Sequence, residues 1–284
     1  MVVLVTGANG QLGQALQSVA KKYPEINFIF AASSDLDITD KENVATYFDS
    51  KKPDYCINAA AYTAVDKAES EQEQAFLVNV KGPQNLAEVS RKTNTVLLHI
   101  STDFVFNGES NHPYTEEDTP DPKGVYGKTK LEGEQTIQQS TAQYYIIRTS
   151  WVYSEFGNNF MKTMLRLASE RDTLNVVNDQ IGTPTYAVDL AEALIAIIRH
   201  DSNTESKPYG IYNFSNEGQC SWFDFAKKIF EVNKVAIQVN PIPTSAYPTP
   251  AQRPEYSVLD KQKIKQAFGI TIADWETALR SITI

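Results

Sequence analysis

The feature that most constrains the fold is a regular alternation of short apolar runs with longer helical segments in the first half of the chain. Five runs rich in β-branched or aromatic residues have the length and composition of buried strands, namely 2–5, 28–31, 55–59, 96–101 and 144–149. Four segments of helical composition lie between them, at 11–22, 41–51, 71–93 and 126–140. This order predicts a parallel sheet with helices on both faces. We therefore expect an α/β fold with a doubly wound, mostly parallel sheet of the Rossmann type.

The second half of the chain has a different pattern. After about residue 150 the alternation loosens, and five prolines accumulate between residues 241 and 254. A chain of 284 residues lies near the upper limit for one domain, so a large domain with a smaller dependent lobe is the natural expectation. We expect residues 151–284 to form mainly this lobe, with some segments returning to the first domain. Residues 108–124, rich in acidic side chains and proline, are predicted to form a surface loop that borders a cleft.

A glycine-rich turn joins the first predicted strand to the first predicted helix. Gly7, Gly10 and Gly13 follow directly after the apolar run 2–5. Glycine lets the backbone turn tightly and approach a pyrophosphate, which the free N–H groups and the positive dipole of a helix start stabilise. The spacing differs by one residue from the general dinucleotide fingerprint, but its position after the first strand favours nucleotide binding over a simple turn. Residues 1–150 are therefore predicted to form a dinucleotide-binding domain.

The end of the second predicted strand bears on the choice of cofactor. A carboxylate at this place normally holds the adenosine ribose of NAD, whereas this chain has Ala31, Ala32, Ser33 and Ser34 there. Small hydroxyl side chains leave space for a 2′-phosphate, although no Arg or Lys nearby pairs with it. NADPH is therefore mildly favoured, and NADH stays possible.

Tyr126 and Lys130 form a candidate acid pair. They lie four residues apart in a predicted helix, so both side chains point to the same face, one turn apart. A nearby ammonium favours the phenolate, so we expect Lys130 to lower the pKa of Tyr126 from about 10 toward the working pH. Tyr126 would then donate a proton to a carbonyl that receives hydride.

The spacing alone is not specific, because Tyr47 and Lys51 match it too. Tyr47 follows the second predicted strand, beside the adenosine half of the expected site, and we assign that pair a structural role. Tyr126 follows the fourth strand, whose carboxyl end should face the nicotinamide. That strand ends at Thr102, whose hydroxyl we expect beside the substrate carbonyl.

Composition and charge exclude several classes of function. A net charge of −9 without any Lys/Arg cluster opposes nucleic-acid binding, while a few placed side chains could still hold an anionic nucleotide. No apolar run is long enough to cross a membrane, and the N-terminus lacks the pattern of a secretory signal, so we expect a cytoplasmic protein. Cys56 and Cys220 are too few for a disulfide framework or a zinc site, and we interpret both as reduced and structural.

Several sequence blocks together resemble the extended short-chain dehydrogenases/reductases. The blocks are residues 7–13, 58–69, 101–106, 125–130, 148–153 and 243–250. The resemblance extends along the whole chain, and several blocks are particular to members that act on dTDP-activated sugars. It implies NAD(P)H-dependent reduction of the C4 keto group of a dTDP-linked 6-deoxy sugar.

The resemblance also implies roles for individual residues. Tyr126 would donate the proton, Lys130 would hold the nicotinamide ribose, and Thr102 would tune the tyrosine. The implied cofactor contacts are Gly7, Gly10, Gln11, Leu12, Gly13, Asp37, Ile38, Ala61, Tyr62, Thr63, Tyr126 and Lys130. The implied contacts to the dTDP-sugar are Thr102, Asp103, Trp151 and Arg253, the last of them to the diphosphate. A role for Trp151 as a core aromatic remains an equal alternative.

Two departures from the family pattern refine these expectations. Some members carry an acidic residue on the first helix that helps a metal bridge two subunits, and this chain has Ala15 there, so we expect no essential metal and a monomer or weak homodimer. Related dehydratases place an Asp-Glu pair after the threonine, whereas Asp103 is followed here by Phe104, which favours simple reduction. Alternatives that stay open are another nucleotide-sugar epimerase or reductase, and a non-catalytic subunit similar to the regulatory subunit of methionine adenosyltransferase.

Overall fold

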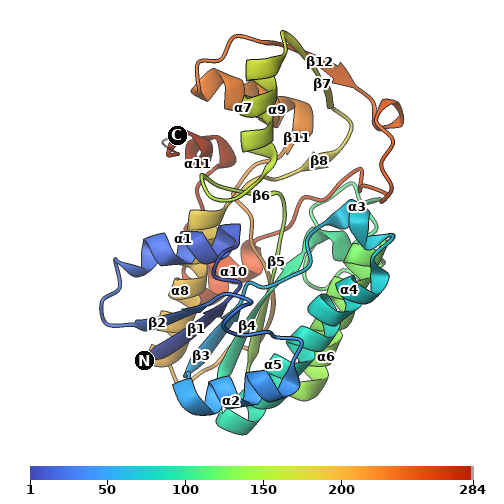
Figure 1. Ribbon diagram of the computed structural model, residues 1–284. Coiled ribbons are helices and arrows are strands. Elements are labelled where there is room, and N and C mark those ends of the chain that lie inside the picture. Colours follow the sequence, from blue (N-terminus) through green and yellow to red (C-terminus); the bar gives the residue numbers. More distant parts are fainter. Residues whose placement is uncertain (283–284) are drawn as a thin grey trace.

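A six-stranded parallel sheet forms the centre of the lower part of the molecule in the computed structural model, which describes residues 1–282 (Figure 1). The strand order is β10-β5-β4-β3-β1-β2, and every neighbouring pair runs parallel. The strands are β1 (Val2–Thr6), β2 (Asn27–Ala31), β3 (Tyr55–Asn58), β4 (Val96–Thr102), β5 (Tyr144–Thr149) and β10 (Gly210–Asn213). All five predicted strands are present, with ends within one residue of the prediction. The sixth, β10, comes from the second half of the chain.

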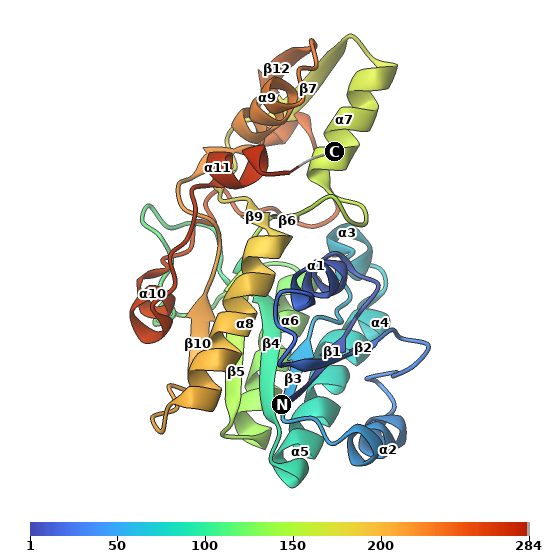
Figure 2. The ribbon, with the colours of Figure 1, turned by 90° about the vertical axis from the view of Figure 1, so that its left-hand side faces the viewer.

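Helices cover both faces of the sheet, as Figure 2 shows in a view turned by 90°. One face carries α1 (Gln11–Ala20), α8 (Ala187–Asn203) and α10 (Gln262–Phe268). The other carries α2 (Lys41–Lys51), α5 (Gly82–Thr93) and α6 (Val125–Ser140). Along β1 the side chains alternate, so that Val3 and Val5 join the first layer and Leu4 joins the second. The predicted doubly wound α/β fold is confirmed.

The predicted helix over 71–93 is interrupted. It consists of α4 (Gln72–Phe76), a π-helical turn η1 (Leu77–Lys81) and α5. Pro83 has no N–H to donate to the carbonyl of Asn79, four residues earlier, and its ring would crowd that oxygen. A wider π turn releases the carbonyl, which lies directly against Gly133 of α6.

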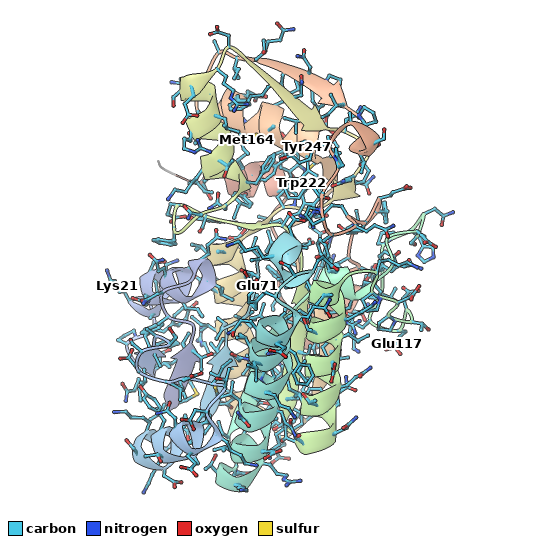
Figure 3. All side chains as sticks on the ribbon, turned by 45° about the vertical axis from the view of Figure 1, so that its right-hand side comes forward. Lys21, Glu71, Glu117, Met164, Trp222 and Tyr247 are labelled. Atoms are coloured by element: carbon cyan, nitrogen blue, oxygen red, sulfur yellow. The ribbon has the colours of Figure 1, made fainter. Side chains whose placement is uncertain are left out.

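A second group of elements has its own apolar core and forms the upper part of Figure 1. It contains α7 (Phe160–Glu170), α9 (Trp222–Val232), α11 (Trp275–Arg280) and the parallel pair β7 (Thr173–Val177) and β12 (Gln238–Ile242). Met164 and Trp222 lie in this upper part, and Lys21 and Glu117 lie in the lower part (Figure 3). Because α8, β10 and α10 pack with the sheet, the chain crosses between the two groups several times. The predicted boundary at residue 150 stays a prediction.

The remaining short elements lie mainly between or beside these two groups. They are α3 (Val65–Ala68), η2 (Asp103–Val105), η3 (Thr244–Ala246), and the pairs β6 (Val152–Tyr153) with β9 (Thr185–Tyr186) and β8 (Ile181–Gly182) with β11 (Cys220–Ser221). Cys56 and Cys220 are both free and buried. Within residues 1–282 no helix is both long and apolar enough to cross a membrane.

The acidic loop 108–124 does not line the main cavity, although Lys123 and Gly124 at its end line a small neighbouring pocket. The prediction that the loop borders a substrate cleft stays a prediction. The backbone of the loop pairs with residues near the C-terminus, where the Tyr114 N–H donates to the carbonyl of Val258. The carboxylate of Glu116 accepts a hydrogen bond from the backbone of Asn213 at 2.8 Å. The loop is therefore hydrogen-bonded both to the edge strand β10 and to a segment near the C-terminus.

Candidate active site

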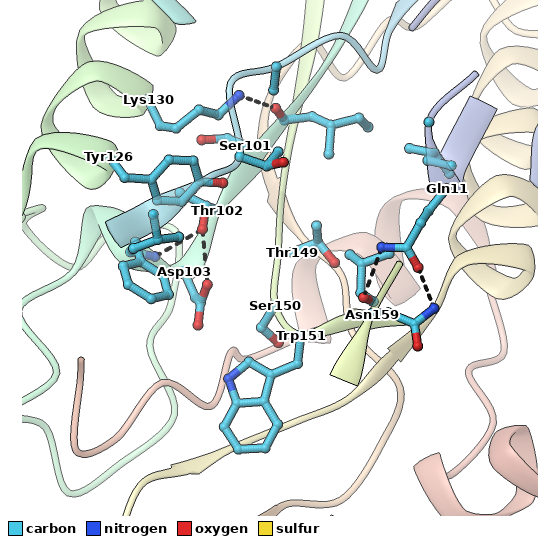
Figure 4. Close-up of a pocket in the computed structure, with 18 of the residues that line it drawn as sticks. Gln11, Ser101, Thr102, Asp103, Tyr126, Lys130, Thr149, Ser150, Trp151 and Asn159 are labelled. Carbon is cyan, nitrogen blue, oxygen red and sulfur yellow. Dashed lines mark hydrogen bonds between the residues drawn. The ribbon is translucent and has the colours of Figure 1, made fainter. Parts of the chain in front are cut away.

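A cavity of about 710 Å³ opens at the carboxyl ends of β1, β4 and β5, between the sheet and the second group of elements. Ligands of open parallel sheets bind at this edge. Eleven of the predicted site residues line it, namely Gly10, Gln11, Leu12, Ala61, Thr63, Thr102, Asp103, Tyr126, Lys130, Trp151 and Arg253. Figure 4 shows how Tyr126, Lys130 and Thr102 lie on one side of this cavity and Gln11 on another.

The glycine-rich turn places the start of α1 at the cavity. Gly7 has a positive φ of 67°, and a Cβ there would lie 2.7 Å from the backbone nitrogen of Ala60. A Cβ on Gly13 would lie 2.3 Å from the carbonyl oxygen of Gly7. These two glycines thus shape the turn and do not line the cavity. Within residues 1–282 no side chain caps the start of α1, and its first turn holds no acidic residue, so its N–H groups can bind an anion.

Tyr126 lies at the end of the cavity formed by β4 and α6. Its ring packs edge-on against Phe104, with 5.6 Å between centroids. The protein atoms packed around the phenol raise its pKa to about 12; the charge of Asp103 adds to this, while the Thr102 hydroxyl opposes it. The expectation that Lys130 lowers the pKa of Tyr126 is therefore wrong. The reason is that the Lys130 ammonium is directed at Ile100 and His99.

Lys130 is almost completely buried, with 2% of its surface exposed. Its Nζ donates to the carbonyl oxygen of Ile100 at 2.7 Å and lies 3.3 Å from Nε2 of His99. Burial lowers the pKa of Lys130 to about 8, and the charge of Glu134 opposes this shift only in part.

Asp103 is a buried carboxyl group at the cavity wall. Its Oδ1 accepts a hydrogen bond from the Thr102 hydroxyl at 3.0 Å. Its Oδ2 is buried without a hydrogen-bond partner among the described residues. Burial raises the pKa of Asp103 to about 6, although the nearby hydroxyl of Ser257, the hydroxyl of Thr102 and the backbone N–H groups oppose the shift.

Trp151 both packs and lines the cavity, so neither of its two predicted roles excludes the other. Its ring stacks on Trp222, with 3.5 Å between centroids and 12° between planes. The backbone of Trp151 has a φ of 45°, which is rare for a bulky residue and characteristic of functional sites. The tight fit of Gly182 against this indole ring leaves no room for a Cβ.

Arg253 is held at the cavity by α3. One terminal nitrogen, Nη2, lies 2.7 Å from the carboxylate of Asp66, which also accepts a hydrogen bond from the backbone of Ala251. The other, Nη1, is buried and has no hydrogen-bond partner within residues 1–282. A free buried guanidinium N–H is suited to an anionic ligand.

Three further predicted contacts lie away from the cavity wall. Asp37 is exposed in the loop after β2, where its carboxylate accepts from Thr39. Ile38 is buried against Gly82, and the Tyr62 hydroxyl donates to Glu71. The structure does not bring these three side chains together with the residues around Tyr126.

The second tyrosine–lysine pair also lies away from the cavity wall. Tyr47 and Lys51 pack on each other on α2, with Nζ 5.6 Å from the ring centroid. Ala15 is completely buried in the core. Among residues 1–282 no group of three or more His, Cys, Asp or Glu side chains could hold a metal.

The match to a family model extends along almost the whole chain. The model described as RmlD substrate binding domain matches residues 1–283. The chain belongs to the RmlD substrate binding domain family. This membership confirms the resemblance predicted from the sequence blocks.

Relatives of this RmlD-family chain are similar over their full length. The dTDP-4-dehydrorhamnose reductase of Aggregatibacter actinomycetemcomitans is 48% identical, and the alignment covers 99% of this chain and 97% of that protein. The enzyme of the same name from Escherichia coli strain K12 is 41% identical, with 99% and 96% covered.

Solved structures share this fold over almost their whole length. A dTDP-4-dehydrorhamnose reductase from Clostridium acetobutylicum has a TM-score of 0.94 at 42% identity, covering 99% of this chain and 98% of the other. One from Bacillus anthracis, solved in complex with NADP, has a TM-score of 0.93 at 39% identity, with the same coverage.

Sequence reasoning missed several cavity residues of this RmlD-family chain. Those from the second half of the chain are Val152, Gly157, Asn158, Asn159, Gln180, Leu190, Trp222 and Pro254. The run from Asn178 to Thr185, which combines polar residues with glycine and proline, has the composition of a functional loop and was the available signal. Trp222 follows a helix-capping Ser221 and gave no signal of its own.

Proposed function

We propose that this RmlD-family protein reduces the C4 keto group of dTDP-4-dehydro-β-L-rhamnose with NAD(P)H to give dTDP-L-rhamnose, the last step in making that sugar donor. The observation that carries the proposal is that Tyr126, Lys130 and Thr102 line the same cavity as the uncapped start of α1. A proton donor and a site for a dinucleotide pyrophosphate thus share one cavity. The full-length identity to named reductases supports the choice of substrate.

The cofactor site fits a nicotinamide dinucleotide. The backbone of Gly10, Gln11 and Leu12 would hold the pyrophosphate, because the helix start offers free N–H groups and no side chain competes for them. Gly7 and Gly13 would let the turn come close to the pyrophosphate. The adenosine and the linking groups would be surrounded by Asp37, Ile38, Ala61, Tyr62 and Thr63. When bound, the cofactor supplies hydride to the keto carbon. We propose NADPH as the main cofactor, with NADH also accepted.

Tyr126 would provide the proton. With its pKa raised to about 12, the phenol is fully protonated near neutral pH, so the donor is present before the substrate arrives. The keto oxygen becomes a strongly basic alkoxide as hydride is added, and it takes the phenolic proton. Thr102 would orient the same oxygen, and Lys130 would hold the nicotinamide ribose and stabilise the tyrosinate that is left.

The remaining cavity residues would bind the dTDP-sugar. Trp151, already stacked on Trp222, presents a rigid aromatic surface to the sugar or the thymine. Nη1 of Arg253 and Oδ2 of Asp103 have no partner in the part of the chain that the structure describes. The first would bind the diphosphate, and the second would accept a hydrogen bond from a sugar hydroxyl. In this proposal residues 1–150 form the cofactor domain and residues 151–284 mainly the substrate lobe. We also propose that the protein is cytoplasmic, that it is a monomer or a weak homodimer, and that it needs no essential metal.

The decisive experiment supplies the keto sugar and follows the cofactor. The upstream epimerase generates dTDP-4-dehydro-β-L-rhamnose in place, and loss of nicotinamide absorbance is measured with NADPH and with NADH. We expect turnover, with NADPH used at least as well as NADH. Binding of NADPH without turnover of either cofactor would instead support a binding protein.

A further inference from the structure

A row of buried polar side chains extends behind Lys130 across three neighbouring strands. His99 of β4 lies 3.3 Å from Lys130 through Nε2 and 3.0 Å from Nδ2 of Asn58 through Nδ1. Asn58 of β3 in turn accepts a hydrogen bond from the hydroxyl of Thr6 of β1 at 2.7 Å. All four side chains are buried, and apolar residues would be the ordinary choice at such positions in a sheet core.

The hydrogen bonds of Asn58 determine which atoms in this row donate and which accept. Its Oδ1 faces two donors, the Thr6 hydroxyl and the backbone N–H of Ala60 at 3.3 Å, so its Nδ2 is the atom directed at His99. An amide nitrogen only donates, so Nδ1 of His99 accepts. Burial and the charge of Lys130 hold the pKa of His99 well below its usual range, so the imidazole is neutral and carries its one proton on Nε2.

The proton on Nε2 points at Lys130. A charged ammonium has three donors and no acceptor, so it cannot accept this hydrogen bond, whereas a neutral amine can. The contact between His99 and Lys130 therefore favours the neutral amine. The other partner of Lys130, the carbonyl of Ile100, accepts from either form.

The charged groups around Lys130 do not reverse this preference. On α6, Glu134 is already paired with Arg148 of β5 at 2.7 Å and also accepts from Ser101 at 2.5 Å. Tyr126, on the same helix, is a neutral phenol, and Asp103 lies at the end of β4 with its own pKa raised by burial. No carboxylate within residues 1–282 forms an ion pair with Lys130.

We propose that His99 is a positioning residue which, held in its Nε2–H tautomer by Asn58 and Thr6, favours neutral Lys130 and so sets the pH range in which that lysine is charged. The inference rests on the proposed function, in which Lys130 contacts the nicotinamide ribose and stabilises the tyrosinate. The row of His99, Asn58 and Thr6 would then have a function. With it, Lys130 can gain or lose its proton near neutral pH, whereas an ordinary lysine would stay charged over that pH range.

The first test measures NADPH affinity against pH by the fluorescence of the reduced nicotinamide, which needs no turnover. In the wild type the affinity should fall as pH rises through the pKa of Lys130, about 8. His99→Leu removes the Nε2–H without adding a charge, and the midpoint should move up by about one pH unit. Asn58→Asp should move it up as well, because a carboxylate only accepts and so favours the tautomer with the proton on Nδ1, which leaves Nε2 free to accept from the ammonium.

The matched control is Asn213→Asp, a buried asparagine on the edge strand β10 that, among the described residues, forms no hydrogen bond with Lys130. It should lower the melting temperature and leave the midpoint unchanged. The proposal would be overturned if the pH midpoint of His99→Leu equals that of the wild type or lies below it. A purely structural histidine would change stability alone.

A second measurement uses the unmodified protein and does not depend on either variant folding. The ¹⁵N shifts of the three histidine side chains report which ring nitrogen carries the proton, and His112→Gln and His200→Gln identify the signal of His99. We expect protonation at Nε2. Protonation at Nδ1 would overturn the inference, while failure of the wild type to bind NADPH would count against the proposed function instead.

Discussion

The hydroxyl of Tyr126 is the atom on which the proposed chemistry depends, and Tyr126→Phe removes only that oxygen. The ring contact with Phe104 remains, so the fold and the NADPH affinity should be kept. Turnover should fall by a factor on the order of 100 or more, as expected for loss of a general acid. Initial rates with saturating NADPH and the keto sugar measure this.

Tyr47→Phe is the internal control, because Tyr47 forms the same tyrosine–lysine spacing on α2, away from the cavity wall. Its rate should match the wild type. Loss of activity in Tyr47→Phe with normal turnover in Tyr126→Phe would place the active site elsewhere.

Asp103 should leave a signature in the pH dependence of stability. Its folded pKa, about 6, lies above the unfolded value of about 4, so the native state binds the extra proton. The corresponding stability is present below about pH 4 and is lost as pH rises through about 6, an effect on the order of 2–3 kcal/mol. The free energy of unfolding of wild type relative to Asp103→Asn, measured in urea at pH 4.5 and 7, should therefore decrease with pH.

Asp118→Asn serves as the comparison for this measurement. Hydrogen bonds from Thr115 lower the pKa of Asp118, so its contribution is lost only when pH falls through that lowered value. Between pH 4.5 and 7 the difference between wild type and Asp118→Asn should be constant. A constant difference for Asp103→Asn as well would mean that Asp103 is not shifted.

At the scale of elements, the packing of α6 on the π-helical turn η1 depends on Gly133. A Cβ at this position would lie 2.1 Å from the carbonyl oxygen of Asn79. Gly133→Ala should therefore cost about 1–3 kcal/mol of folding free energy, although alanine normally gains up to about 1 kcal/mol over glycine within a helix. Denaturant unfolding measures the change. Gln138→Ala, on the exposed side of the same helix, should stay within about 0.5 kcal/mol, and a more stable Gly133→Ala protein would contradict this close approach.

Elements whose pattern is local could be predicted from the sequence. The strands of the first half are continuous apolar runs, and the glycines after β1 mark the turn by themselves. The break at η1 could not be predicted in the same way, because it combines Pro83 with the approach of a distant helix. Strand β10 was missed because it is four residues long and follows a polar segment.

The candidate site shows the same limit. Tyr126 and Lys130 could be found because both lie on one helix. The direction of the Lys130 ammonium could not, since it depends on Ile100 and His99 of a strand some thirty residues earlier. For the same reason the expected lowering of the Tyr126 pKa was wrong, and the row of His99, Asn58 and Thr6 was not anticipated.

At the scale of the whole molecule, the central sheet is completed by the second half of the chain. Helix α8 covers one face together with α1, and its apolar side is fully buried there. A fragment of residues 1–150 would lack both α8 and β10. We expect it to bind a hydrophobic dye and to unfold without a cooperative transition, as followed by circular dichroism during heating. Cooperative unfolding with NADPH binding would show that this part folds alone.

The position of β10 in the sequence also has a consequence for synthesis. Strand β5 ends at Thr149, but the strand that pairs with its outer edge begins only at Gly210. While the ribosome adds the residues between them, the nascent chain carries an open parallel edge beside an uncovered apolar surface. Such edges are templates for pairing with other chains. The yield of this protein in a cell should therefore depend on the rate of translation through residues 150–209 and on the chaperones that meet the chain there, independently of how stable the finished molecule is.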